Sequence, residues 1–78
     1  VVYIGDVEHH IIRRMTPDGT VTTIAGQVGG AGSSDGTGTA ARFNQPVGLA
    51  VDPAGRVLVA DFANSTIRRV TAAGAVST

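Results

Sequence analysis

The chain has 78 residues, about half the length of a typical domain, and its six arginines balance six acidic residues to a net charge of zero. Without lysine or a basic field, the composition argues against a nucleic-acid partner, and the absence of cysteine excludes disulfides and thiolate zinc sites. No apolar run approaches the roughly 20 residues of a membrane-spanning helix, so no membrane span is expected.

Short apolar runs separated by turn residues follow one another along the whole chain. They lie, in order, at 2–4, 11–15, 21–25, 47–51, 57–60, 66–70 and 76. Several intervening segments contain Asp-Gly or Asp-Pro, in which glycine accepts a positive φ and proline presets φ. No window keeps a 3.6-residue period, so only one short helical turn, near 39–42, is expected. The pattern predicts an all-β protein built from small antiparallel hairpins.

The sequence contains an internal repeat. Residues 1–23 align without gaps on residues 56–78, a shift of 55, and nine of these 23 positions are identical. The run at 57–60 is apolar at every position, as expected for a small sheet that is covered on both faces. A repeated four-stranded meander of about 40 to 55 residues is typical of a β-propeller.

The second half of the chain resembles the NHL repeat family. The residues that carry the resemblance are Phe43-Asn44-Gln45-Pro46-Val47-Gly48-Leu49-Ala50-Val51-Asp52, then Gly55 to Asp61, Asn64, and Ile67-Arg68-Arg69-Val70. Residues 21–26 and the Gly-rich stretch after them are similar to a long-linker form of the repeat. The first copy departs from the pattern at Gly5, where alanine is usual, and has His9 where the second has Asn64.

The resemblance implies a β-propeller fragment of two adjacent blades, with strands lettered a to d outward from the central channel. Residues 1–25 are expected to hold strands b, c and d of one blade, which lacks its innermost strand. Residues 26–46 are a Gly-rich inter-blade loop, of which 36–41 are expected on the surface, and residues 47–78 hold strands a, b, c and the start of d of the next blade. We expect an excerpt of a longer chain, because Val1 opens within a strand-like run and no targeting segment is visible.

The remaining blades of the propeller, from the same chain or another copy, are therefore the expected partners. A propeller protects its sheet edges by closing into a ring, and small repeats need about three or more neighbours for stability. The 78 residues alone are not expected to melt cooperatively at high temperature as a monomer.

Loops of an antiparallel meander alternate between its two ends. The turns at 6–10 and 61–65 should thus share one end with the long loop, and this end is the better candidate for binding a ligand. Its candidate residues are Asp6, Glu8, His9, His10, Asp35, Arg42, Asp61 and Asn64.

Residues of the repeat motif are assigned structural roles, because a catalytic group is normally needed only once. Asp6 and Asp61 can accept backbone N–H groups across their turns, and Arg13 and Arg68 can pair with a carboxylate in a bidentate manner. A ring of arginines that binds an anion is the alternative. The structural set is Asp6, Arg13, Gly19, Pro46, Gly48, Asp52, Asp61, Arg68 and Gly74.

The histidine pair at 9–10, beside Asp6 and Glu8, could suggest a metal site, and a solvated turn is the favoured interpretation. Adjacent residues in a tight turn point apart, and the aligned residues of the second copy, Asn64 and Ser65, are poor ligands. No metal is assigned.

Other motifs lack the context that their chemistry needs. Residues 36–41 match G-x-G-x-x-A without the adjacent strand and long helix of a dinucleotide site, and Asp35-Gly36 lacks the spacing of a calcium loop. No serine lies in a nucleophile elbow. No catalytic residue and no cofactor are assigned.

The resemblance implies a non-catalytic propeller segment that acts as a scaffold or as a module that binds protein or glycan ligands. Some relatives are metal-dependent lyases or lactonase-like hydrolases, and part of such an enzyme is the alternative. RNA binding, known for other relatives, is disfavoured by the zero net charge and the few aromatic residues. The Gly-rich, lysine-free style resembles bacterial secreted or cell-surface repeat proteins.

Overall fold

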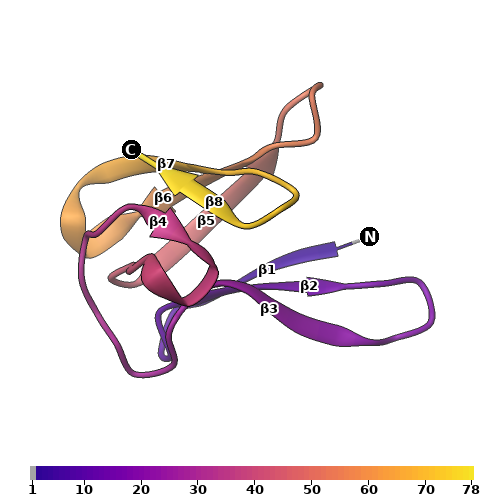
Figure 1. The fold of residues 1–78 in the computed structure, drawn as a ribbon, viewed down its shortest axis with the longest axis horizontal. Helices are drawn as coiled ribbons and strands as arrows, with labels where there is room; N and C mark the ends of the chain where they lie inside the picture. The colour runs from indigo at the N-terminus through magenta and orange to yellow at the C-terminus, as the bar shows by residue number, and fades with distance from the viewer. Residues whose placement is uncertain (1) are drawn as a thin grey trace.

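Residues 2–78 are described by the computed structural model, and they form two antiparallel sheets (Figure 1). The first sheet has the order β1-β2-β3, with β1 (Val2–Asp6), β2 (Ile11–Met15) and β3 (Val21–Gly26). The second has the order β4-β8-β7-β6-β5, with β4 (Gly36–Thr37), β5 (Pro46–Val51), β6 (Val57–Asp61), β7 (Thr66–Val70) and β8 (Ala75–Ser77). The all-β prediction is confirmed, with two adjacent blades of which the first lacks its innermost strand.

The hairpin turns form where the sequence places Asp and Gly. Gly19 adopts a φ of 89°, and the carboxylate of Asp18 accepts the backbone N–H of Thr20 at 3.1 Å. In the β5–β6 turn, Asp52 accepts the backbone N–H of Arg56 at 2.8 Å. These side chains replace hydrogen bonds that the backbone cannot make within a tight turn. The strand ends are therefore determined by local sequence.

The long connection between the blades, residues 27–45, contains secondary structure that the predicted loop did not include. It contains β4, which pairs with β8 at the outer edge of the second sheet, and a 3-10 turn, η1 (Gly38–Ala40). Ala41 and Phe43 of this connection are fully buried. The expectation of a surface loop at 36–41 was wrong for Ala41, because the blades diverge outward (Figure 1) and the connection fills the space between them.

The core lies between the two blades. At the inner side, β1 lies against β5, and farther out η1 lies against β3 (Figure 1). A second 3-10 turn, η2 (Phe62–Asn64), follows β6 and was not expected from the sequence. The buried core combines both sheets with the connection, and its members are Ile12, Ala25, Ala41, Phe43, Val57, Val59, Val70 and Val76.

Each sheet also has a face turned away from this core. The strand register places Gly48, Ala60 and Ile67 side by side on the outer face of the second sheet. This face forms a shallow apolar hollow that also includes Ala50 and Leu58. Such a face is covered by the next blade in a propeller. Within residues 2–78, no helix has the length and apolarity needed to cross a membrane.

Candidate functional site

Three segments meet at one end of the two blades. They are the β1–β2 turn (7–10), the connection, and the β6–β7 turn (62–65), and we call this end the turn face. Gly29 donates its backbone N–H to the carbonyl of His9 at 3.1 Å, and Phe62 donates to the carbonyl of Gln45 at 3.2 Å. The predicted gathering of these loops is therefore present in the fold.

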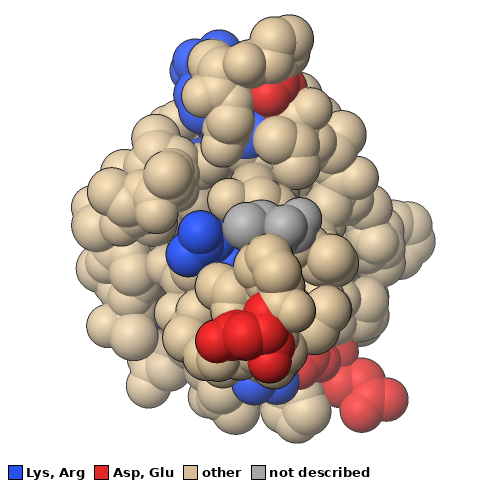
Figure 2. Space-filling view, turned by 90° about the vertical axis from the view of Figure 1, so that its right-hand side faces the viewer, with Lys and Arg blue, Asp and Glu red and all other residues tan. Residues whose placement is uncertain are grey.

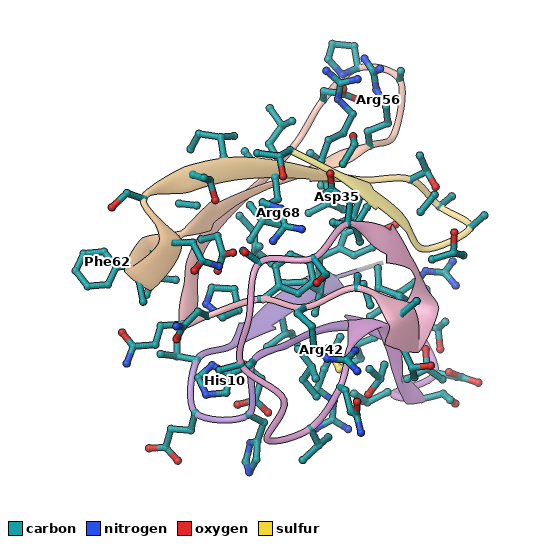
Figure 3. The ribbon with its side chains drawn as sticks, turned by 60° about the vertical axis from the view of Figure 1, so that its left-hand side comes forward. His10, Asp35, Arg42, Arg56, Phe62 and Arg68 are labelled. Atoms are coloured by element: carbon teal, nitrogen blue, oxygen red, sulfur yellow. The ribbon has the colours of Figure 1, made fainter. Side chains whose placement is uncertain are left out.

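Arg68 of β7 lies buried beneath the turn face and holds the connection (Figure 3). Its Nη1 donates to Asp61 Oδ2 at 3.0 Å and to the carbonyl of Arg42 at 2.8 Å. Its Nη2 donates to Asp35 Oδ1 at 2.8 Å and to the carbonyl of Ser34 at 3.0 Å. One guanidinium thus joins two carboxylates and two backbone carbonyls, instead of pairing with a single carboxylate as the sequence suggested.

Asp61, at the end of β6, completes the same network. Its Oδ1 accepts the backbone N–H of Asn44 at 2.7 Å, and its Oδ2 accepts Asn64 Nδ2 at 2.7 Å. The amide of Asn64 also donates to the carbonyl of Gly32 at 2.7 Å. The backbone partner of Asp61 comes from the connection, so the predicted bond across its own turn was wrong. We call Asp35, Asp61, Asn64 and Arg68 the clasp.

The clasp combines a buried half and an exposed half. The side chains of Arg68 and Asp61 are both 0% exposed, whereas that of Asp35 is 51% exposed. The hydrogen bond from Arg68, and next that from Thr78 at 2.9 Å, lower the pKa of Asp35 below its ordinary value. The Arg68 guanidinium lies 5.1 Å from the centre of the Phe43 ring, within the range of a cation–π contact.

The clasp accounts for several of the predicted ligand residues. Asp61 is fully buried and Asn64 is bound to the connection, so neither is free to face a ligand in the described residues. Arg42 folds back and donates to the carbonyls of Thr39 and of Ala41, the latter at 2.9 Å. Both terminal nitrogens of Arg68 are occupied, which speaks against an anion site at this arginine.

The first copy of the repeat has a looser arrangement at the turn face. His9 Nδ1 lies 2.9 Å from Asp6 Oδ2, in the position where Asn64 bonds to Asp61 in the second copy. His10 turns the other way, and its Nδ1 accepts the backbone N–H of Gln45 at 3.1 Å. The two histidines diverge as predicted. Residues 2–78 contain no group of three or more potential metal ligands.

The exposed side chains of the turn face include one that the sequence left undecided. Phe62, at the start of η2, is 66% exposed and projects away from the fold (Figure 3). Its neighbours Asp61 and Asn64 are held by the clasp. Glu8 and His9 are exposed on the β1–β2 turn. The sequence shows an aromatic residue in a turn, but not whether a neighbour covers it.

The opposite end of the blades carries the turns between β2 and β3, β5 and β6, and β7 and β8. Its charged side chains lie in separate small groups of both signs, with no continuous basic patch on the face shown in Figure 2. Hydrogen bonds lower the pKa values of two carboxyls at this end: that of Asp18 chiefly through Thr16, and that of Asp52 chiefly through the backbone N–H of Arg56. These groups stabilise their turns.

Comparison with known proteins agrees with the fold. The family model of the NHL repeat matches residues 43–70. Protein SUPPRESSOR OF QUENCHING 1, chloroplastic, from Arabidopsis thaliana is 40% identical over 70 residues, which are 88% of this chain and 6% of that protein. An auxiliary nutrient binding protein from Bacteroides thetaiotaomicron matches with a TM-score of 0.83 and 27% identity, over 97% of this chain and 22% of that one. The chain therefore spans a small part of either relative.

Proposed function

Residues 43–70 are an NHL repeat within two adjacent blades of a β-propeller, and from this we propose that the chain is a non-catalytic scaffold and interaction module of a larger protein. The observation that carries the proposal is that recurring polar residues are engaged in hydrogen bonds within the fold. Asp61 and Arg68 hold the connection to the second blade through hydrogen bonds to its backbone. Groups engaged in this way stabilise a scaffold.

We propose the turn face as the binding surface, for a protein or glycan ligand. Phe62 offers an exposed aromatic ring, and aromatic residues are enriched where proteins bind partners. Glu8 and His9 supply exposed hydrogen-bonding groups on the same end of the blades. The name of the Bacteroides thetaiotaomicron relative, an auxiliary nutrient binding protein, supports a binding role.

The complete propeller, screened on a glycan array and in parallel against candidate proteins by titration calorimetry, tests this proposal. We expect Phe62→Ser to weaken binding of a ligand found in either screen by about tenfold or more, as for an aromatic hot spot. Ala73→Ser, an exposed turn residue at the opposite end, is the control and should leave the affinity unchanged. An equal loss in both variants would contradict the assignment of the turn face.

The alternative, part of a metal-dependent enzyme, predicts a different result. Elemental analysis of the purified complete propeller would then find a stoichiometric metal, and its removal would abolish a hydrolase or lyase activity. That outcome would overturn the non-catalytic proposal whatever the ligand screens show.

A further inference from the structure

The face of the second blade that packs against the first blade has an equivalent on the first blade, and this equivalent face is turned away from the second blade. A shift of 55 residues carries residues 1–23 of the first blade onto residues 56–78 of the second. The strand register places Ile4 opposite Arg13 and, in the same way, Val59 opposite Arg68. Val59 is 0% exposed against the core, whereas Ile4 is 37% exposed. The outer face of the first blade thus repeats a surface that is covered in the second.

Arg13 shares the strand position of Arg68 but, within residues 2–78, none of its hydrogen bonds, and it does not pair with Asp6 as Arg68 pairs with Asp61. In both arginines Nε is buried and has no hydrogen-bond partner within residues 2–78. The terminal nitrogens of Arg68 have four acceptors, and three of these belong to the connection at Ser34, Asp35 and Arg42. Across residues 2–78, by contrast, the side chain of Arg13 takes part in none of the hydrogen bonds or ion pairs. A guanidinium set in this way offers two donor nitrogens to an incoming segment.

The acidic partner is also present in the first copy. Asp6 corresponds to Asp61, and His9 bonds to Asp6 as Asn64 bonds to Asp61. Asp6 Oδ1 takes part in no hydrogen bond within residues 2–78, whereas Asp61 Oδ1 accepts the backbone N–H of Asn44. The first blade therefore has the cation, the carboxylate and the orienting side chain of the clasp, but no segment that they hold.

We propose that Arg13, Asp6 and His9 form a socket for the inter-blade connection that leads into the first blade. The segment that fits it presents two backbone carbonyls and a carboxylate to the terminal nitrogens of Arg13, and a backbone N–H to Asp6. It also places an aromatic ring against Arg13, as Phe43 does against Arg68. Charge complementarity favours this occupant, because an arginine at the edge of an apolar face needs acceptors when that face is covered. We assign the segment that occupies the socket to an earlier part of the same polypeptide.

Hydrogen–deuterium exchange, measured by mass spectrometry on the complete propeller, tests the socket. Arg13→Lys removes the fork of donors but keeps the charge, which is not conservative at such a site. We expect it to raise exchange in the connection before the first blade by about tenfold or more, and to leave residues 27–45 unchanged. Arg68→Lys should have the reverse effect. Arg14→Lys, on the other face of β2, is the matched control and should change neither segment.

His9 provides a second test that spares Arg13, in case Arg13→Lys does not fold. His9→Asn copies the second repeat and should keep the preceding connection protected, whereas His9→Ala should raise its exchange. Unchanged exchange of that connection in both Arg13→Lys and His9→Ala would overturn the proposal. A uniform rise over all blades would also overturn it, because that result indicates a loss of general stability. Protection that depends on protein concentration would show that another copy fills the socket, contrary to the proposal.

Discussion

Replacement of Arg68 by methionine is expected to remove the strongest link between the second blade and its connection. Methionine fills a similar volume but donates no hydrogen bond, so Asp61 remains as a buried carboxylate without its cation. The side chains of both residues are 0% exposed, and their contact is 3.0 Å long. Removing one partner of a buried ion pair costs about 3–5 kcal/mol.

Most of the free-energy cost of Arg68→Met is expected to come from Asp61 and less from the other partners of Arg68. Asp35 is half exposed, and water can replace the lost donor there, whereas water does not reach Asp61. The expected loss is a large part of the roughly 5–15 kcal/mol that stabilises a typical protein. Arg68→Met should therefore loosen the connection before the rest of the propeller unfolds.

Urea unfolding of the complete propeller, in a double-mutant cycle with Asp61→Asn, measures this loss. The double variant should be less destabilised than the sum of the two single variants, because the neutral amide that Asp61→Asn introduces no longer needs the cation. A cost of Arg68→Met below about 1 kcal/mol, or strict additivity, would refute the assignment of a buried pair.

Two further predictions concern packing and pH. Gly5→Ala should destabilise the blade interface by about 1–3 kcal/mol, because a Cβ on residue 5 would lie 2.7 Å from the carbonyl oxygen of Pro46. Gly48→Ala is the control and should cost less, because a Cβ there would have its nearest neighbour 3.6 Å away. Equal losses of stability in thermal unfolding of the two variants would contradict the close contact at Gly5. Arg68 and Thr78 lower the pKa of folded Asp35, so its contribution to stability is present above the ordinary carboxyl pKa and is lost as the pH falls through the lowered value. Asp35→Asn should therefore lessen the loss of stability on acidification, measured as urea midpoints between neutral pH and pH about 2. The same decrease of the urea midpoint with falling pH in the variant and in the unmodified protein would contradict this role of Asp35.

The sequence predicted those parts of the fold that depend on local chemistry or on the repeat. Apolar runs and Asp-Gly turns located the hairpins, because backbone preferences act within a few residues. The shift of 55 residues indicated blades and marked Asp61 and Arg68 as recurring residues, which the structure places in contact with each other. The side chain of Asp6 pairs with the ring of His9, where the sequence had suggested a backbone N–H of the same turn.

The tertiary structure decided what the connection does. Phe43 and Ala41 are buried because the blades diverge and leave a space that this segment fills. The carbonyls of Ser34 and Arg42 bind Arg68 across 34 and 26 residues of sequence, and every residue has such a carbonyl, so no sequence pattern marks them. The same is true of Gly5, whose lack of a side chain matters only because Pro46 of the other sheet lies against it. Local sequence determined the strands, and long-range packing determined which polar groups are used within the fold and which remain free on its surface.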